Sequence, residues 1–386
     1  MVPENLTFRD NQLDFFFQAE PLQQEIHMNG WNAPKDMFIN PYWKQFEAPN
    51  PFMHYLLGIL YTGLMIVACI GNGIVIYVFS MSKTLRTPAN LFVVALAVTD
   101  FLMMLKTPVF IYNSFHAGPV YGNIGCIIYG TVGAYSGLMS AFCNAVISYD
   151  RYRVIACPFS SSKLTNKKAV AMLLGIVLYV SPFALLPAFE IWNRYVPEGY
   201  LTSCTADYFQ HDLNGRSFIF CIWFFAWFIP VIIIFCCYFR IYAAVRDHEN
   251  QLREQAKKMN VENLRTNQNQ KDTRGEIRIA KVAFGIIMLF LFSWVPYILV
   301  AFIGAFSTKE RQLITPLMSM VPALTLKASA CFDPFIYAIN HPKYRLELQK
   351  KIPWLCIHES YSDNASTCSN KTQLSGDTTP TVNSDG

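Results

Sequence analysis

Seven apolar stretches, separated by polar segments, dominate the sequence. Each is long enough to cross a bilayer, which takes about 20 helical residues. Inside a bilayer the backbone must satisfy its own hydrogen bonds, so stretches of this length and composition predict membrane-spanning helices. The expected fold class is therefore all-α, a bundle of seven transmembrane helices. We place the helices at 53–80, 89–114, 124–157, 168–192, 214–244, 277–306 and 313–340.

The distribution of positive charge predicts how this bundle is oriented. The first connection carries Lys83 and Arg86, and the third and fifth carry more Lys and Arg residues. The second carries none, and the fourth carries only Arg194 and Arg216, among acids. Positively charged connections lie on the cytoplasmic side, so the N-terminus is expected outside the cell and the C-terminus inside. The net charge of +5 is modest, and the positive charge is concentrated in particular loops, which argues against a nucleic-acid ligand. Asn5-Leu6-Thr7 is a glycosylation sequon, so Asn5 is a candidate modification site on the outer tail.

Composition divides the chain into four regions. Residues 1–52 form a polar extracellular tail, and residues 53–340 form the transmembrane domain. Residues 341–355 alternate apolar and basic side chains at helical spacing, which predicts a short amphipathic helix on the membrane surface, in contact with lipid. Residues 356–386 are rich in Ser, Thr, Asn and Asp, which predicts a disordered cytoplasmic tail. The charged fifth connection, from Asp247 to Glu276, is expected to extend helices five and six.

Four ionisable residues fall inside the apolar stretches: Asp100, Lys106, Lys327 and Asp333. Ionisable groups at membrane depth are costly, and they usually mark a functional site. The sequence shows no metal-ligand cluster, phosphate-binding loop or hydrolase constellation, so enzyme activity is not expected.

Five short motifs occur on the expected helices, in a fixed order. Together they resemble the rhodopsin-like G-protein-coupled receptors over the whole membrane region. The sequence departs from the family pattern at Asp333, where Asn is usual, at Ser293, where Cys is usual, and in helix four, which lacks the usual tryptophan. The motifs are Gly71-Asn72, Leu96-Ala97-Val98-Thr99-Asp100, Asp150-Arg151-Tyr152, Trp294-Val295-Pro296 and Asp333-Pro334-Phe335-Ile336-Tyr337.

This resemblance implies a cytoplasmic switch and an extracellular disulfide. In the family, the arginine equivalent to Arg151 lies on the G-protein side and pairs with an acid at the foot of helix six, here Glu276. A solvated charge pair is the simpler alternative. The family also has a disulfide at the positions of Cys126 and Cys204, both expected outside the cell, where a disulfide persists. The implied switch residues are Asp150, Arg151, Tyr152, Tyr238, Glu276, Asp333, Pro334 and Tyr337.

Lys327 points to the ligand. It lies seven residues before Pro334, and an amine there can condense with an aldehyde to give a Schiff base. In opsins the lysine at this position holds 11-cis-retinal or a hydroxylated retinal, so the chain resembles an invertebrate visual opsin. Vertebrate visual opsins place a counterion where this chain has Tyr129, whereas invertebrate opsins place it where this chain has Glu198. Glu198 is therefore the expected counterion, with Glu190 as the alternative.

Lys106 is relevant to the wavelength of light that the expected pigment absorbs. Insect ultraviolet-sensitive opsins have a lysine at this place, and a nearby cation disfavours protonation of a Schiff base. The resemblance therefore implies an ultraviolet-sensitive pigment, with a blue-sensitive pigment as the alternative. The alternative for Lys106 is that it pairs with an acid and only supports the fold. Light is expected to act through Trp294 and the Pro296 kink to move helix six.

The cytoplasmic segments Ala256–Val261 and His341–Arg345 resemble those of invertebrate visual pigments. That likeness implies coupling to a Gq-type protein, location in the photoreceptor rhabdomere membrane, and tail phosphorylation by a receptor kinase before arrestin binds. Rival interpretations are a receptor for a diffusible ligand, an ion or proton transporter that uses Asp100, Lys106 and Asp333, and a retinal photoisomerase.

Overall fold

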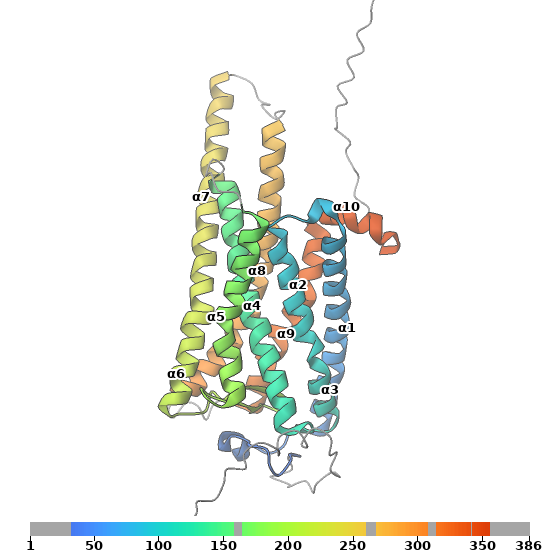
Figure 1. The fold of residues 1–386 in the computed structure, drawn as a ribbon, viewed down its shortest axis with the longest axis vertical. Helices are drawn as coiled ribbons and strands as arrows, with labels where there is room; N and C mark the ends of the chain where they lie inside the picture. The colour runs from blue at the N-terminus through green and yellow to red at the C-terminus, as the bar shows by residue number, and fades with distance from the viewer. Residues whose placement is uncertain (1–31, 158–163, 260–267, 308–313, 341, 356–386) are drawn as a thin grey trace, which may run out of the picture.

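The computed structural model describes residues 32–157, 164–259, 268–307, 314–340 and 342–355, and the seven apolar stretches are helical and bundled side by side (Figure 1). Several stretches are divided into consecutive elements. The elements are α1 (Pro51–Met81), α2 (Asn90–Leu105), α3 (Thr107–Phe115), α4 (Gly122–Ala156), α5 (Asn166–Leu185), α6 (Leu213–Cys221), α7 (Ile229–Met259), α8 (Gln268–Phe306), α9 (Pro316–Asn340) and α10 (Pro342–Lys351).

The polarity of the bundle is that of a membrane protein. Within the described residues, six helical runs are long and apolar enough to cross a membrane. The seventh, α9, has 25 residues and carries the buried Lys327 and Asp333. Large apolar side chains such as Leu178 and Phe292 are 74% and 78% exposed, as expected for surfaces that face lipid. The predicted all-α bundle of seven helices is thus confirmed.

Prolines shape the helices near the end of the bundle at which α1 and α4 begin, which the sequence predicts to lie outside the cell and which we call the outer end. Helix α2 ends at Leu105 and α3 begins at Thr107, because Pro108 has no N–H to donate and its ring clashes with the preceding turn. Lys106 stands at this junction. The fourth stretch was predicted to run to residue 192, but α5 ends at Leu185 and a 3-10 turn follows from Leu186 to Phe189, which contains Pro187.

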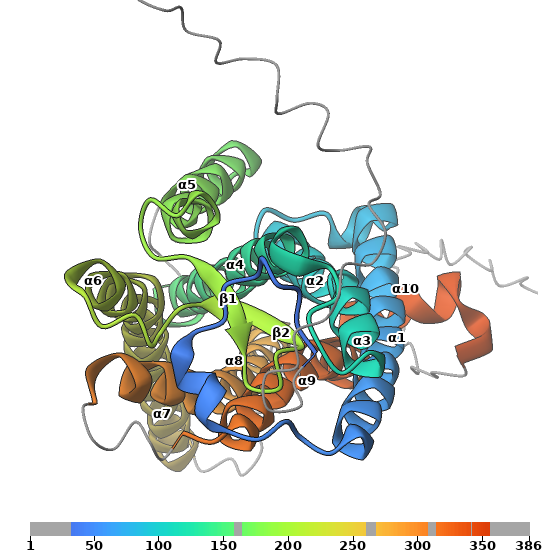
Figure 2. The ribbon, with the colours of Figure 1, turned by 90° about the horizontal axis from the view of Figure 1, so that it is seen from below.

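A β-hairpin covers the outer end of the bundle (Figure 2). Strand β1 (Tyr195–Glu198) pairs antiparallel with β2 (Ser203–Ala206), and Glu198 lies opposite Ser203. The turn between them includes Gly199 at a φ of 58°, a conformation that glycine adopts without a steric cost. The hairpin therefore holds the Glu198 side chain over the centre of the bundle.

The segment that precedes α1 packs on this hairpin, where Figure 2 shows it crossing the outer end of the bundle. Its short 3-10 turn, Pro41–Gln45, buries Trp43 and stacks the Tyr42 ring on the Phe209 ring at 3.8 Å. Asp207 joins the parts, because its carboxylate accepts hydrogen bonds from the Asn40 amide at 2.8 Å and from the Arg194 guanidinium at 3.4 Å.

At the opposite end, the fifth and sixth membrane-spanning helices continue beyond the apolar stretches as α7 and α8. The charge of the fifth connection predicted this extension. Helix α7 reaches Met259 and α8 begins at Gln268. After α9 the short helix α10 packs against the end of α1, where the Tyr344 ring stacks on the Phe79 ring at 5.3 Å. The nearby Ser82 hydroxyl lowers the pKa of the Glu347 carboxyl on α10, and Glu347 forms an ion pair with Lys350 at 3.6 Å.

Candidate functional site

A cavity of about 140 Å³ lies among the helices beneath the hairpin. A second, more apolar cavity of about 120 Å³ adjoins it. The residues that line both cavities are Leu138, Thr205, Ala206, Ile222, Trp294 and Tyr297. Together they form an interior space that is mostly apolar. The polar and charged side chains that line the first cavity are Lys106, Tyr129, Tyr195, Glu198, Thr205, Trp294, Tyr297 and Lys327.

Lys327 supplies a buried amine to this cavity. The residue is only 4% exposed, and its Nζ atom donates to the Ala323 carbonyl oxygen one turn earlier in α9, at 3.1 Å. The Nζ atom lies 5.2 Å from the centre of the Tyr61 ring and 5.8 Å from that of the Tyr129 ring. Among the described residues, neither phenol hydroxyl has a hydrogen-bond partner. The Lys327 amine is therefore buried among aromatic rings, with one backbone carbonyl as its acceptor.

Glu198 supplies the buried carboxylate. It is 3% exposed and is surrounded by hydroxyl groups from three different elements. Burial raises the pKa of Glu198, whereas the charge of Lys327 and the hydroxyl donors act in the opposite direction. Lys327 and Glu198 are not in direct ion-pair contact in the described structure. The donors are the hydroxyls of Tyr297 at 3.1 Å, Ser203 at 3.3 Å, Tyr208 at 3.4 Å and Ser319 at 3.4 Å.

Sequence reasoning missed these four hydroxyl residues. One signal was available, because Tyr297 follows Trp294 by three residues and so shares its helix face. The Tyr297 hydroxyl also lies 2.7 Å from the Thr205 hydroxyl, which ties α8 to strand β2. The alternative counterion, Glu190, is exposed and is not part of the cavity wall.

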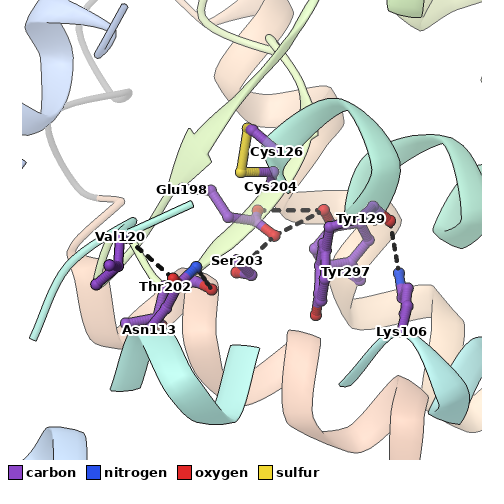
Figure 3. Close-up of a disulfide and its surroundings, with 10 residues drawn as sticks. All are labelled: Lys106, Asn113, Val120, Cys126, Tyr129, Glu198, Thr202, Ser203, Cys204 and Tyr297. Carbon is purple, nitrogen blue, oxygen red and sulfur yellow. Dashed lines mark hydrogen bonds between the residues drawn. A yellow bond between two sulfur atoms is a disulfide. The ribbon is translucent and has the colours of Figure 1, made fainter. Parts of the chain in front are cut away.

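The disulfide between Cys126 and Cys204 is present and fixes the hairpin to the start of α4, with the two Cα atoms 5.2 Å apart (Figure 3). This confirms the predicted pairing. Cys204 directly follows Ser203, one of the donors to Glu198, so the bridge anchors the strand opposite the carboxylate.

Lys106 reaches the same cavity from the junction of α2 and α3. Its Nζ atom donates to the Tyr129 carbonyl oxygen at 3.2 Å and lies 4.0 Å from the centre of the Tyr129 ring (Figure 3). Among the described residues, no acid forms an ion pair with Lys106. Two amines, Lys106 and Lys327, thus line a cavity with one carboxylate, Glu198.

Trp294 forms part of both cavity walls and packs against α4 at Gly137, where a Cβ atom would overlap the indole ring. Deeper in the bundle, two further carboxyl groups, those of Asp100 and Asp333, are buried. The Ser140 hydroxyl also donates to Asp100 at 3.4 Å.

The predicted switch residues are partly described. Arg151 contacts the neighbouring Asp150 carboxylate, and Tyr152 follows on the same turn of α4. The Tyr238 hydroxyl donates to the Ala280 carbonyl oxygen at 3.3 Å and so links α7 to α8. Pro334 packs its ring against Gly71 of α1. The side chains of Glu276 and Tyr337, and the whole of Asn5, lie outside the described residues.

Comparison with known proteins agrees with this geometry. The family model of the seven-transmembrane receptors of the rhodopsin family matches residues 71–337. Opsin Rh3 of Drosophila pseudoobscura pseudoobscura is 48% identical over 353 residues, which is 91% of this chain and 92% of that protein. The ultraviolet-sensitive opsin of Apis mellifera is 48% identical over 341 residues, 88% of this chain and 91% of that protein.

A solved structure shows the same architecture. The crystal structure of squid rhodopsin superposes with a TM-score of 0.78 at 35% identity, covering 86% of this chain and 94% of that one. The fold, the arrangement of the motifs and the sequence identity agree. The chain therefore belongs to the rhodopsin family of seven-transmembrane receptors, among the insect-type opsins, and is a light-activated G-protein-coupled receptor rather than an enzyme.

Proposed function

We propose that this opsin is an ultraviolet-sensitive visual pigment in which Lys327 holds the chromophore. The observation that carries the proposal is the set of three charged groups in one cavity: the Lys327 amine, the Glu198 carboxylate and the Lys106 amine. Lys327 is the residue for covalent attachment, because its amine is buried and faces aromatic rings rather than water.

The two adjoining cavities fit an elongated apolar ligand with one reactive end. Lys327 and Glu198 mark the polar end in the first cavity, and the second cavity has walls of Trp223, Trp227 and Phe302. Bound there through a Schiff base on Lys327, 11-cis-retinal or a hydroxylated retinal would supply the absorption of light. The hydroxyls of Tyr61 and Tyr129 offer hydrogen-bonding capacity that the described protein does not use.

Glu198 acts as the counterion in this proposal. Its carboxylate stabilises a proton on the Lys327 Nζ atom, since an unpaired buried charge is strongly disfavoured. The four hydroxyl donors and the disulfide hold the carboxylate over the cavity.

Lys106 has the opposite effect to Glu198 on the proton at the Lys327 Nζ atom. A cation in the same cavity disfavours a proton on the Lys327 Nζ atom. An unprotonated nitrogen confines the electrons of the attached group, which moves absorption to the near ultraviolet. Lys106 is therefore the residue to which we attribute the ultraviolet band.

Activation then follows from differential stabilisation of two arrangements of α8, the sixth membrane-spanning helix. Trp294 lies between the cavity and the Pro296 kink of α8, so a change of shape in the cavity is passed to this helix. At the cytoplasmic end the Arg151–Glu276 contact opens, and Tyr238 and Tyr337 rearrange around it to admit the G protein.

The cellular setting follows from the family likeness. A Gq-type protein is the expected partner, and receptor kinase and arrestin act on the phosphorylated tail. The extracellular N-terminus is glycosylated at Asn5, and the protein resides in the rhabdomere membrane.

The test is an absorption spectrum of the purified protein after incubation with 11-cis-retinal in darkness. The parent should show a light-sensitive near-ultraviolet band, Lys106→Glu should move it into the visible, and Lys327→Ala should bind no chromophore. Lys167→Glu makes the same charge change at an exposed position and should leave the band in place. A visible band in the parent would favour a blue-sensitive opsin, and no bound chromophore in the parent would refute the proposal.

A further inference from the structure

The Lys106 ammonium is held by one turn of the neighbouring helix α4. Its Nζ atom donates to the Tyr129 carbonyl oxygen at 3.2 Å and lies 4.0 Å from the centre of the Tyr129 ring. Gly133 follows one turn later, and a Cβ atom built on it would overlap the Lys106 Nζ atom. The Tyr129 carbonyl, the Tyr129 ring face and the bare Cα of Gly133 therefore form a cradle around the ammonium, which we call the Lys106 cradle.

The chemistry of this cradle suits a cation. A carbonyl oxygen has two lone pairs, so the Tyr129 oxygen can accept from the helix backbone and from Lys106 together. The ring face carries negative electrostatic potential and attracts a cation at this distance. Glycine completes the cradle only because it has no side chain, since any other residue at position 133 would fill the place of the amine.

We propose that Gly133 is a positioning residue that keeps the Lys106 ammonium in this cradle and thereby sets its effect on Lys327 across the cavity. The inference rests on the proposed function, because it explains how the residue responsible for the ultraviolet band is held in place. No part of it requires Gly133 to touch the chromophore.

The substitution Gly133→Ala separates this role from a structural one. The overlap involves the far end of a flexible lysine side chain, so the amine moves and the helix stays. Alanine is also a better helix former than glycine, which favours folding of the variant. The displaced amine loses the carbonyl and the ring face, both of which stabilise its charged form, so a larger fraction of it is neutral.

The first experiment needs no chromophore. The full-length protein is treated with formaldehyde and cyanoborohydride, which methylate neutral amines, and the labelling rates of Lys106 and Lys327 are followed by mass spectrometry. Gly133→Ala should raise the rate at Lys106 about tenfold, the factor that corresponds to the loss of one hydrogen bond to a charged group. Gly175→Ala is the matched control, since nothing lies within 4 Å of a Cβ atom there, and its Lys106 rate should equal that of the parent. An unchanged rate in Gly133→Ala would overturn the proposal.

The second experiment measures absorption spectra with bound 11-cis-retinal for Gly133→Ala, Lys106→Met and the double variant. Both single variants should move the band from the ultraviolet towards the visible, and the double variant should resemble Lys106→Met. A shift from Gly133→Ala that persists without Lys106 would mean direct contact with the chromophore and would overturn the inference.

Gly137→Ala is a contrasting variant one turn along α4, because its Cβ atom would overlap the Trp294 ring rather than Lys106. It should therefore change the absorption band both in the parent and in Lys106→Met. If Lys106→Met leaves the band unmoved, the ultraviolet assignment fails, while the labelling rates still decide whether the cradle exists.

Discussion

The carboxylate of Asp207 joins the segment before α1 to the hairpin, and its removal should loosen the outer end of the bundle. In Asp207→Ala, the buried Asn40 amide and the Phe209 backbone N–H both lose their acceptor. Each buried donor left without a partner costs about 1–3 kcal/mol. The Arg194 side chain is 32% exposed, so water screens the loss of its ion pair, which adds only about 0–1 kcal/mol.

Part of this cost is offset, because burial raises the pKa of Asp207 and its ionised form is itself unfavourable there, although the charge of Arg194 acts against the shift. We therefore expect Asp207→Ala to lower the free energy of unfolding by about 3 kcal/mol. Asp207→Asn keeps an acceptor for Asn40 and Phe209 and should cost about 1 kcal/mol or less.

The assay is thermal denaturation in detergent, followed by tryptophan fluorescence. At roughly 2–4 °C for each kcal/mol, Asp207→Ala should melt about 6–12 °C below the parent, and Asp207→Asn within about 4 °C of it. Equal losses in the two variants would show that the charge, and not the hydrogen bonding, holds the segment. A loss below about 2 °C in Asp207→Ala would refute the reasoning altogether.

Three further predictions follow from groups at the outer end. Tyr297→Phe removes a donor to the Glu198 carboxylate and should raise the pKa of Glu198 further, so its protonated C=O infrared band should persist to higher pH than in the parent. Asp212 caps α6 by accepting from the Gly215 backbone N–H at 2.8 Å, so Asp212→Ala should cost about 1 kcal/mol in a denaturation assay, whereas Asp212→Asn should cost little. Because burial raises the pKa of Asp207, protonation of this carboxyl favours the folded state. That proton-linked part of its stability is fully present below the usual Asp pKa and is lost as pH rises through the folded-state pKa, so the melting temperature of the parent should fall relative to that of Asp207→Asn from pH 3 to pH 8.

Much of the fold could be predicted because the bilayer imposes a simple rule on sequence. The seven apolar stretches correspond to helices, and the motifs around Asp100, Arg151 and Asp333 lie on the helices expected for them. The end of the fourth stretch could not be predicted from hydropathy alone. Residues 186–192 are mostly apolar, but Pro187 disrupts the helical hydrogen bonds there.

Only the charged residues of the candidate site could be predicted from the sequence. Lys106, Glu198 and Lys327 stood out, because charges in or near apolar stretches are rare and costly. The hydroxyl donors around Glu198 did not, because Ser203, Tyr297 and Ser319 come from separate elements and are ordinary residues in each. Gly133 could not be recognised from the sequence either, because its proposed role depends on the absence of a Cβ atom beside Lys106.

The length of α8 has a mechanical consequence. From Pro296 to the start of the helix at Gln268 is 28 residues, which at 1.5 Å of rise for each residue is an arm of about 42 Å. A tilt of only about 10° at the proline would carry the far end of that arm through about 7 Å. Displacements of a fraction of an ångström around Trp294 are thus geometrically magnified at the far end of α8, and the magnification is set by the number of residues in the helix rather than by the strength of any contact.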